Sequence, residues 1–182
     1  MPGKKDLLRL LVTNDVLAIL IGGLALRIYN SPRVTHDMDL AIRTLDADQV
    51  IQLMYRAGYL LVTGVDDQWA YVHQQPQEAV AWLEQSSVAS MTFVQVSPRS
   101  SGASVPLHCI DITTQVDYLF DLTVPIMRLK ERAQAVRLDD FTILVAAPED
   151  LLLLKKDRRA KTAADYADIQ FLENLIDDGT ST

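Results

Sequence analysis

The alternation of apolar and polar positions along the chain predicts a series of short strands interleaved with amphipathic helices. Apolar runs bounded by turn residues predict strands at 17–21, 38–43, 59–63, 70–72, 91–96, 107–112, 136–138 and 142–145. Apolar residues that recur with helical spacing predict helices at 4–12, 24–29, 47–57, 129–135, 148–158 and 163–176. This order of elements is typical of an α/β (α+β) domain, in which helices pack on a mixed β-sheet.

Two segments are less regular. Residues 73–90 are compatible with a loop and a short helix or with a hairpin, and the serine-rich residues 97–104 predict a loop. Pro148 suits the first turn of a helix, and acids follow it directly. Because the chain has no internal repeat and no long linker, we expect a core domain at 1–146 with a C-terminal helical segment at 147–182 packed on it.

Composition narrows the class of protein. A hydrophobic content of 49% with 23% charged residues is ordinary for a soluble globular domain. No apolar run is long enough to cross a membrane, and the first residues lack the pattern of a signal peptide. A single cysteine, Cys109, excludes an intramolecular disulfide, and the three histidines lack zinc-site spacing. We therefore expect a cytoplasmic protein without disulfides.

The net charge and the distribution of basic residues point to different partners. The formal net charge of −7 argues against broad attraction to a nucleic-acid backbone. Five of the 17 basic residues are nevertheless concentrated at positions 155–161. This cluster is explained either by a solvated helix face or by a surface that binds phosphate groups.

The strongest candidate site lies between residues 18 and 43. A predicted strand ends at Gly22 and Gly23, whose lack of a Cβ allows a phosphate to approach the backbone closely. Asp37 and Asp39 follow at the start of the next strand, where side chains two positions apart point to the same face. Mg²⁺ is typically held by one or two carboxylates together with substrate phosphates. The segment therefore predicts a phosphate cradle followed by a site for a divalent cation.

Two acids separated by one residue carry little information alone, because about three such pairs are expected by chance in a chain with this many acids. The chain has a second pair, Asp46 and Asp48, at the start of the helix predicted at 47–57. There Asp46 is interpreted as the helix N-cap and Asp48 as an acid of the first turn. Asp37 and Asp39 differ because a glycine turn precedes them and a strand follows them.

Residues 18–43 resemble the signature of the nucleotidyltransferase superfamily of the polymerase-β type. In that family a hydrophobic strand ends in Gly-Gly or Gly-Ser, and Arg-x-Thr and Asp-x-Asp follow a short helix. The matching residues are Gly22-Gly23, Arg33-Val34-Thr35 and Asp37-Met38-Asp39. A later block resembles the small stand-alone members, including abortive-infection and toxin–antitoxin nucleotidyltransferases; it consists of Pro148-Glu149-Asp150-Leu151, Lys155, Asp165 and Asp168. Residues 64–105 show no such resemblance.

The resemblance implies metal ligands that would also be the catalytic residues. Asp37 and Asp39 would bind the metal ions, and the family's third carboxylate, which lies on a later strand, would be Asp111. Asp117 is the alternative for this third position. Asp111 is favoured because apolar residues alternate around it.

The resemblance also implies a set of nucleotide-binding residues, namely Gly22, Gly23, Arg33 and Lys155. Arg33 is equally well explained as a surface arginine, and Lys155 has an alternative as a solvated helix lysine. Asp165 and Asp168 share one face of a helix, where an ion pair with Lys161 or Arg158 is the simpler explanation for Asp165.

The resemblance finally implies a fold and an activity. We expect the nucleotidyltransferase fold and a Mg²⁺- or Mn²⁺-dependent transfer of a nucleoside monophosphate from NTP to a hydroxyl acceptor. The acceptor stays open among RNA such as tRNA, protein and a small molecule, and a toxin-type enzyme with a cognate antitoxin is one form of this hypothesis. The alternative is a catalytically inactive member that serves as a binding or regulatory module. Mutually repulsive carboxylates argue for the enzyme, because an inactive relic has no reason to keep them.

Overall fold

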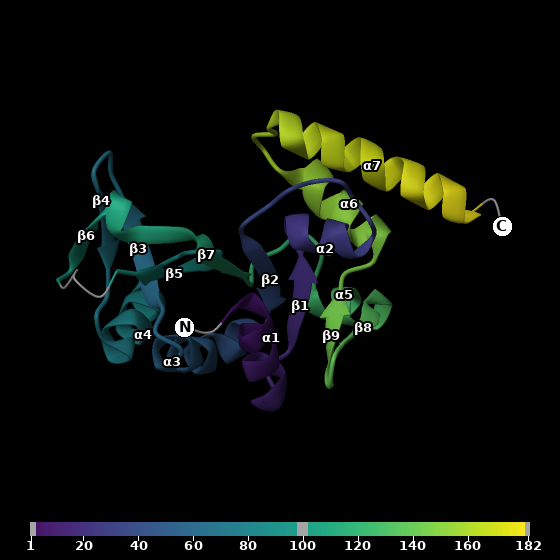
Figure 1. Ribbon diagram of the computed structural model, residues 1–182. Coiled ribbons are helices and arrows are strands. Elements are labelled where there is room, and N and C mark those ends of the chain that lie inside the picture. Colours follow the sequence, from purple (N-terminus) through teal and green to yellow (C-terminus); the bar gives the residue numbers. More distant parts are fainter. Residues whose placement is uncertain (1–2, 98–101, 181–182) are drawn as a thin grey trace.

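A computed structural model describes residues 3–97 and 102–180, with side chains described up to Asp178. In this part of the chain, nine strands form one mixed sheet in the order β6-β4-β3-β5-β7-β2-β1-β9-β8 (Figure 1). The strands are β1 (Ala18–Ile21), β2 (Met38–Ile42), β3 (Leu60–Val65), β4 (Trp69–Val72), β5 (Ser90–Val96), β6 (Ser104–Pro106), β7 (Ile110–Leu119), β8 (Gln134–Leu138) and β9 (Phe141–Val145). The β1–β9 and β2–β7 pairs are parallel, and the other neighbouring pairs are antiparallel.

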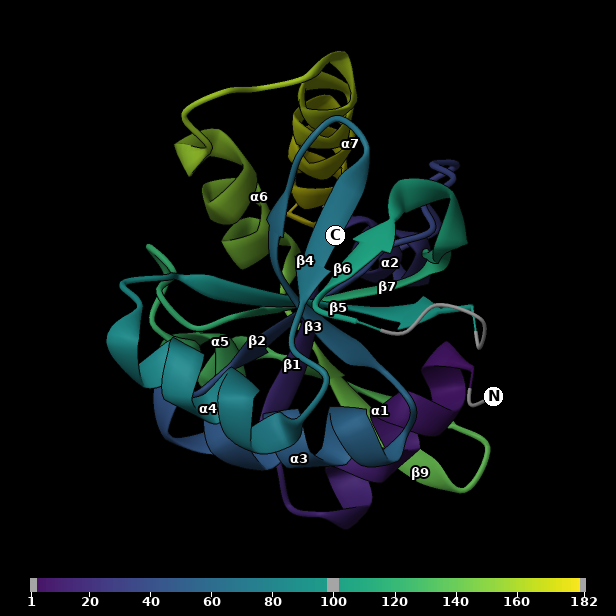
Figure 2. The same cartoon turned by 90° about the vertical axis from the view of Figure 1, so that its left-hand side faces the viewer.

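The α-helices of the described residues are α1 (Lys4–Thr13), α2 (Gly22–Ile28), α3 (Ala47–Arg56), α4 (Pro76–Gln85), α5 (Ile126–Arg132), α6 (Pro148–Asp157) and α7 (Ala163–Thr180). Figure 2 shows α1, α3 and α4 along one side of the twisted sheet and α6 and α7 on the opposite side. The observed architecture is the mixed sheet with packed helices that the sequence pattern predicts. None of the helices in the described residues is both long and apolar enough to cross a membrane.

The central strands bring distant parts of the sequence to one place. β1 runs antiparallel to β2, and its last residue, Ile21, is paired with Asp39. β2 runs parallel to β7, and Asp39 is aligned with Asp117. The turn from β1 into α2, the start of β2 and the second half of β7 therefore lie side by side.

The main core lies between these strands and the helices on the α3 side. Tyr118 of β7 donates a hydrogen bond to Sδ of Met54 on α3 at 3.0 Å, and its ring meets Phe93 of β5 edge-on with centroids 5.7 Å apart. Leu151 of α6 and Leu172 of α7 belong to the same buried cluster. The C-terminal helices thus pack on the core, while the division between residues 146 and 147 stays a prediction.

Several local expectations are corrected. Of the two alternatives for residues 73–90, the loop with a short helix is confirmed, since the segment contains the helix α4. The strand predicted at 107–112 begins only at Ile110 and continues to Leu119, because Leu107–Cys109 form a 3-10 turn. α2 begins at Gly22, so the glycine pair lies inside the first turn of the helix. Of the loop predicted at 97–104, residues 98–101 lie outside the described residues.

Asp46 occupies the N-cap position of α3, but it does not cap the helix with its side chain. Its carboxylate instead accepts hydrogen bonds from Nε and Nη2 of Arg43, both at 2.6 Å. A bidentate guanidinium–carboxylate pair is stronger than a neutral cap bond, which explains why the carboxylate turns toward the arginine.

Candidate active site

Gly22 brings the end of β1 against the carboxylate of Asp39. Its φ of +66° lies in the left-handed region, which favours glycine. A Cβ at this position would lie 1.8 Å from Oδ2 and 2.6 Å from Cγ of Asp39. No other residue fits this space without displacing that carboxylate. The sequence pattern explains Gly22 by the approach of a phosphate. The structure gives a second reason for a glycine here, which is the position of the Asp39 carboxylate.

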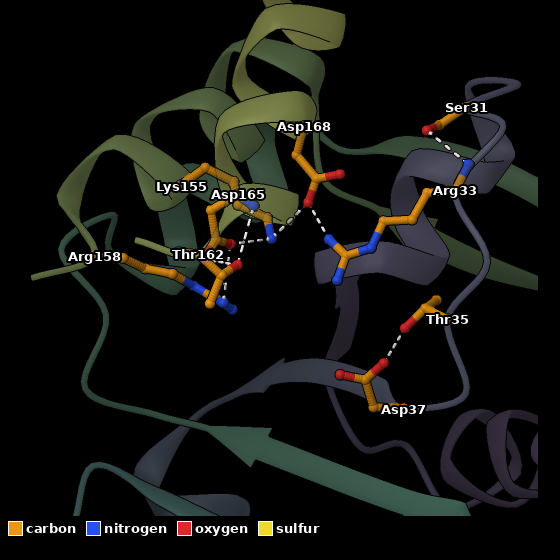
Figure 3. A network of polar contacts seen from close by, with 9 residues as sticks. All are labelled: Ser31, Arg33, Thr35, Asp37, Lys155, Arg158, Thr162, Asp165 and Asp168. Carbon is orange, nitrogen blue, oxygen red and sulfur yellow. Dashed lines mark hydrogen bonds and ion pairs between the residues drawn. The ribbon is translucent and has the colours of Figure 1, made fainter. Parts of the chain in front are cut away.

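Gly23 has a different neighbour. A Cβ there would lie 2.8 Å from Cγ2 and 3.1 Å from Oγ1 of Thr35. Thr35 donates a hydrogen bond to Asp37 (Figure 3). Burial alone would raise the pKa of Asp37, but this bond and the charges of Arg33 and Lys4 hold the pKa below its usual value. Gly23 thus lets the loop approach α2 and present Asp37 in its ionised form.

Asp39 and Asp117 are neighbours across β2 and β7. The pKa of Asp39 is raised from 3.8 to about 6, first by burial and then by the negative charges of Asp37 and Asp117. Lys155 and Arg158 act in the opposite direction. Three acids therefore repel one another at this point, and a bound cation would relieve that repulsion.

Of the two acids considered for the third carboxylate, the alternative, Asp117, is aligned with Asp39, and the favoured Asp111 is not; which of them has this role stays a prediction. Asp111 is aligned with Gln95 of β5 and Asp117 with Thr92, so their partners lie three positions, or about 10 Å, apart along that strand. The prediction relied on apolar alternation around Asp111, but Ile112 is 67% exposed. The buried apolar residues that alternate with an acid on β7 are Val116 and Tyr118, on either side of Asp117.

Asp117 is held in place by its neighbours. Its Oδ1 accepts a hydrogen bond from Oγ1 of Thr92 at 2.5 Å, and its Oδ2 accepts one from Nε2 of Gln115 at 2.7 Å. Neither of these two supporting residues was singled out from the sequence. The contact of Thr92 with Asp117 depends on the pairing of β5 with β7, and no local sequence motif predicts this pairing.

Lys4 is a further residue that sequence reasoning missed. Burial lowers its pKa, and the negative charges of Asp37, Asp111 and Asp39 act in the opposite direction. The first turn of α1 therefore places an ammonium group in the surroundings of these acids. Asp111 contributes to the same surroundings, although it is not the residue aligned with Asp39.

A cavity of about 370 Å³ lies between Asp39 and the helix α6. Leucines of α2, β7 and α6 form its apolar wall, and these include Leu26, Leu119 and Leu154. The rest of the lining includes Gly22, Asp39, Lys155 and Arg158. Apolar walls with a few convergent polar groups are typical of small-molecule sites.

Lys155 is the centre of an ion-pair network between α6 and α7 (Figure 3). Its Nζ lies 2.9 Å from Oδ1 of Asp165 and 2.8 Å from Oδ2 of Asp168. Arg158 contacts Asp165 at 3.2 Å, and Arg33 donates a hydrogen bond to Asp168. Lys155 is only 4% exposed, so it is not a solvated helix lysine. The predicted ion pair of Asp165 with Arg158 is confirmed, with Lys155 as its second cation.

The basic cluster recognised in the sequence has partners within the chain. Besides the network of Lys155 and Arg158, Lys156 forms an ion pair with Glu173 at 2.7 Å. Nζ of Lys161 donates a hydrogen bond to the backbone oxygen of Arg158 at 2.8 Å. Most of the cluster is thus engaged by the protein itself, which weakens its interpretation as a surface for phosphate groups of a nucleic acid.

Among the described residues, no group of three or more His, Cys, Asp or Glu side chains is arranged to hold a metal ion. A cage built entirely from three such side chains is therefore not found in this part of the chain. Asp37 and Asp39 remain the pair whose sequence spacing predicts cation binding, with Asp117 beside Asp39.

The raised pKa of Asp39 predicts a pH-dependent stability. An unfolded aspartate loses its proton near 3.8 and folded Asp39 only near 6, so the folded state binds more protons between these values. The free energy of unfolding should therefore fall as the pH rises through this window. Asp39→Asn should remove this loss and raise the melting temperature at pH 7.5 by about 5 °C in the absence of divalent cations.

Calorimetric melting of both proteins from pH 4 to 8 measures this effect. The difference between them should shrink toward pH 4. Asp150 also has a pKa raised by burial, but it is present in both proteins and cancels in the comparison. An equal melting temperature at every pH would contradict the placement of Asp39 among repelling acids.

Comparisons with known proteins bear on the fold. No protein-family model matches the chain, and no curated protein matches it in sequence. Its structure is similar to that of a putative nucleotidyltransferase from Thermotoga maritima, which is 10% identical, with 96% of this chain and 90% of that chain covered and a TM-score of 0.50. It is also similar to the lincosamide antibiotic adenylyltransferase LnuA in its lincomycin-bound form, at 16% identity, 92% coverage of each chain and a TM-score of 0.47. The protein has the nucleotidyltransferase fold.

Proposed function

We propose that the protein is a nucleotidyltransferase that moves a nucleoside monophosphate from NTP to a hydroxyl group. The observation that supports this most is the alignment of Asp39 with Asp117, with Gly22 packed against the Asp39 carboxylate. Asp37 precedes the same strand, and the cavity beside Asp39 is bordered by Lys155 and Arg158. Carboxylates and cations thus meet at one cavity in a chain with the nucleotidyltransferase fold.

The residues fit a bound divalent cation. Repulsion among carboxylates raises the pKa of Asp39, and this is the electrostatic condition that a cation relieves. Mg²⁺ needs only one or two protein carboxylates when phosphate oxygens supply further ligands, so a cage of three acids is not required. We propose Asp37 and Asp39 as the ligands for Mg²⁺ or Mn²⁺, with Asp117 adjacent. When bound, the ion would stabilise charge on the reacting phosphates.

The proposed reaction is a displacement at the α-phosphorus of NTP. A bond forms between the acceptor oxygen and this phosphorus, the bond from phosphorus to the oxygen bridging the α and β positions breaks, and pyrophosphate leaves with that electron pair. The acceptor proton passes to a carboxylate of the site or to water. Gly22 makes room for the Asp39 carboxylate, and the charges of Lys155 and Arg158, which act on Asp39, would also offset the charge of the triphosphate.

The acceptor chemistry is narrowed by charge. The net charge is −7, and most of the basic cluster near α7 is already paired within the chain. Both observations favour a small or protein acceptor over a nucleic acid. A toxin-type role with a cognate antitoxin remains a hypothesis from the resemblance alone.

Transfer can be tested without knowing the acceptor. The purified protein is incubated with Mg²⁺, a cell extract and each NTP, labelled either at the α or at the γ phosphate. We expect the α label to appear on a product and the γ label to leave only as pyrophosphate. Transfer of the γ label would indicate a kinase instead. Binding of NTP without any transfer would support the inactive binding module.

The two candidates for the third carboxylate give different results in the same assay. Asp117→Asn should lower transfer by about 10²-fold, since an acid next to Asp39 is removed from the reacting charges. Asp111→Asn should change it by no more than about threefold, because Asp111 is exposed and not aligned with Asp39. The reverse pattern of losses would restore Asp111 to the site.

A further inference from the structure

The network between α6, α7 and the loop before β2 contains more positive than negative charge. Arg33, Lys155 and Arg158 supply the cations, and Asp165 and Asp168 supply the carboxylates. Asp165 and Asp168 are only 2% and 3% exposed. Both acids are therefore buried and not open to an approaching anion, and with three cations to two acids the network retains a net positive charge.

Asp165 is held by more than the cations around it. Oδ2 of Asp165 accepts hydrogen bonds from the backbone N and from Oγ1 of Thr162, at 3.0 and 2.9 Å. These contacts anchor the carboxylate at the start of α7. Its pKa is held well below the usual value by Lys155 and Thr162, in spite of burial. Asp165 is thus a charged and immobilised group.

The three cations differ in how many N–H donors they keep available for a ligand. Lys155 is buried and its ammonium is shared between both acids, so it holds the network together. Arg33 and Arg158 are partly exposed, and each reaches its acid through Nη1. A guanidinium has several N–H donors in a planar fork, so one contact leaves the others for phosphate oxygens.

The positions of these arginines match the acids of the site. Arg33 belongs to the loop that leads to Asp37, and Arg158 lines the same cavity as Asp39. Figure 3 shows the guanidinium of Arg33 between Asp168 above and Asp37 below.

We infer that Asp165 and Asp168 are positioning residues, which orient Arg158 and Arg33 so that these two arginines contact the phosphates of the nucleotide. Lys155 is the buried link between the two acids rather than the group that reaches the triphosphate. The inference rests on the proposed function, because it assigns residues of the same site to the binding of NTP. Its consequence is that a change on α7 alters triphosphate binding although it removes no cation.

Asp168→Asn tests this inference, with Glu173→Gln as the matched control. Glu173 also joins α7 to α6, through Lys156, but both side chains are about half exposed. Binding of a non-hydrolysable NTP and of the corresponding nucleoside monophosphate is measured by calorimetry with Mg²⁺. Asp168→Asn should weaken binding of the triphosphate by about tenfold and of the monophosphate by less than about twofold. Glu173→Gln should change neither.

A double-mutant cycle separates positioning from general damage. If Asp168 acts through Arg33, then Arg33→Ala and the double variant Arg33→Ala/Asp168→Asn should bind the triphosphate equally, within about twofold. Should Asp168→Asn fail to fold, Asp168→Glu keeps the charge and displaces the carboxylate, and the same loss is expected. Unchanged or tighter triphosphate binding in the folded Asp168 variant would overturn the inference, as would equal loss for both ligands. Failure of the unmodified protein to bind any NTP would instead count against the proposed function.

Discussion

Asp39→Asn should reduce nucleotidyl transfer by roughly 10³-fold, or about 4 kcal/mol of transition-state stabilisation. Asp39 is the acid that contacts Gly22 and is aligned with Asp117, so its charge lies at the centre of the proposed cation site. An amide has similar shape but lacks the negative charge. Steady-state transfer from α-labelled NTP measures the loss.

The chain supplies its own control for this change. Asp48 belongs to the second Asp-x-Asp pair, in the first turn of α3, and it is exposed. Asp48→Asn should leave transfer within about twofold of the unmodified protein. If Asp39→Asn retained full transfer while remaining folded, Asp39 would not be part of the reacting site.

Gly22→Ala should reduce transfer about as much as Asp39→Asn, because the added Cβ would meet Oδ2 of Asp39 at 1.8 Å. The carboxylate must then leave its position or the turn from β1 into α2 must move. The left-handed φ of Gly22 adds a backbone cost of about 1–2 kcal/mol. Activity and thermal melting are measured together.

Gly58→Ala isolates the backbone cost. Gly58 has a φ of +82°, and nothing lies within 4 Å of a Cβ built on it. This variant should lose only about 1 kcal/mol of stability and keep its transfer activity. Equal activities of Gly22→Ala and Gly58→Ala would show that the contact between Gly22 and Asp39 has no functional role.

The fold was largely predictable, because the spacing of apolar residues and the positions of turn residues indicate most of its helices and strands. The segment from β1 through Gly22 and Gly23 to Asp39 carries its own turn, strand and helix signals, and its elements occur in the predicted order, with α2 beginning two residues earlier than predicted. The closing glycine of α3 is equally local, since Gly58 has the positive φ expected of a residue that follows a helix.

The third carboxylate was not predictable in the same way. The register of β5 with β7 is irregular. Phe93 is paired with Val116 and Gln95 with Asp111, so two positions along β5 correspond to five along β7. This irregularity exposes Ile112 and interrupts the alternation on which the choice of Asp111 depended. The register of β2 with β7 is a tertiary property, so sequence spacing alone could name Asp117 only as the alternative to Asp111.

The α7 network shows a second limit. The sequence places Lys155 on one helix and Asp165 and Asp168 on the next, but their mutual burial depends on how α6 and α7 pack. Arg33 joins them from a loop more than a hundred positions away. Ion pairs between distant segments depend on how the helices and loops pack, and the hydrophobic periodicity of the sequence does not predict that packing.

Calorimetric titration of a non-hydrolysable NTP into the protein tests the central claim most directly, because it requires no acceptor. We expect binding that depends on Mg²⁺, that disappears on chelation, and that is lost in Asp39→Asn but retained in Asp48→Asn. Absence of binding for all four common NTPs at saturating Mg²⁺, in a protein shown to be folded, would contradict a nucleotide site at Asp39 and Asp117.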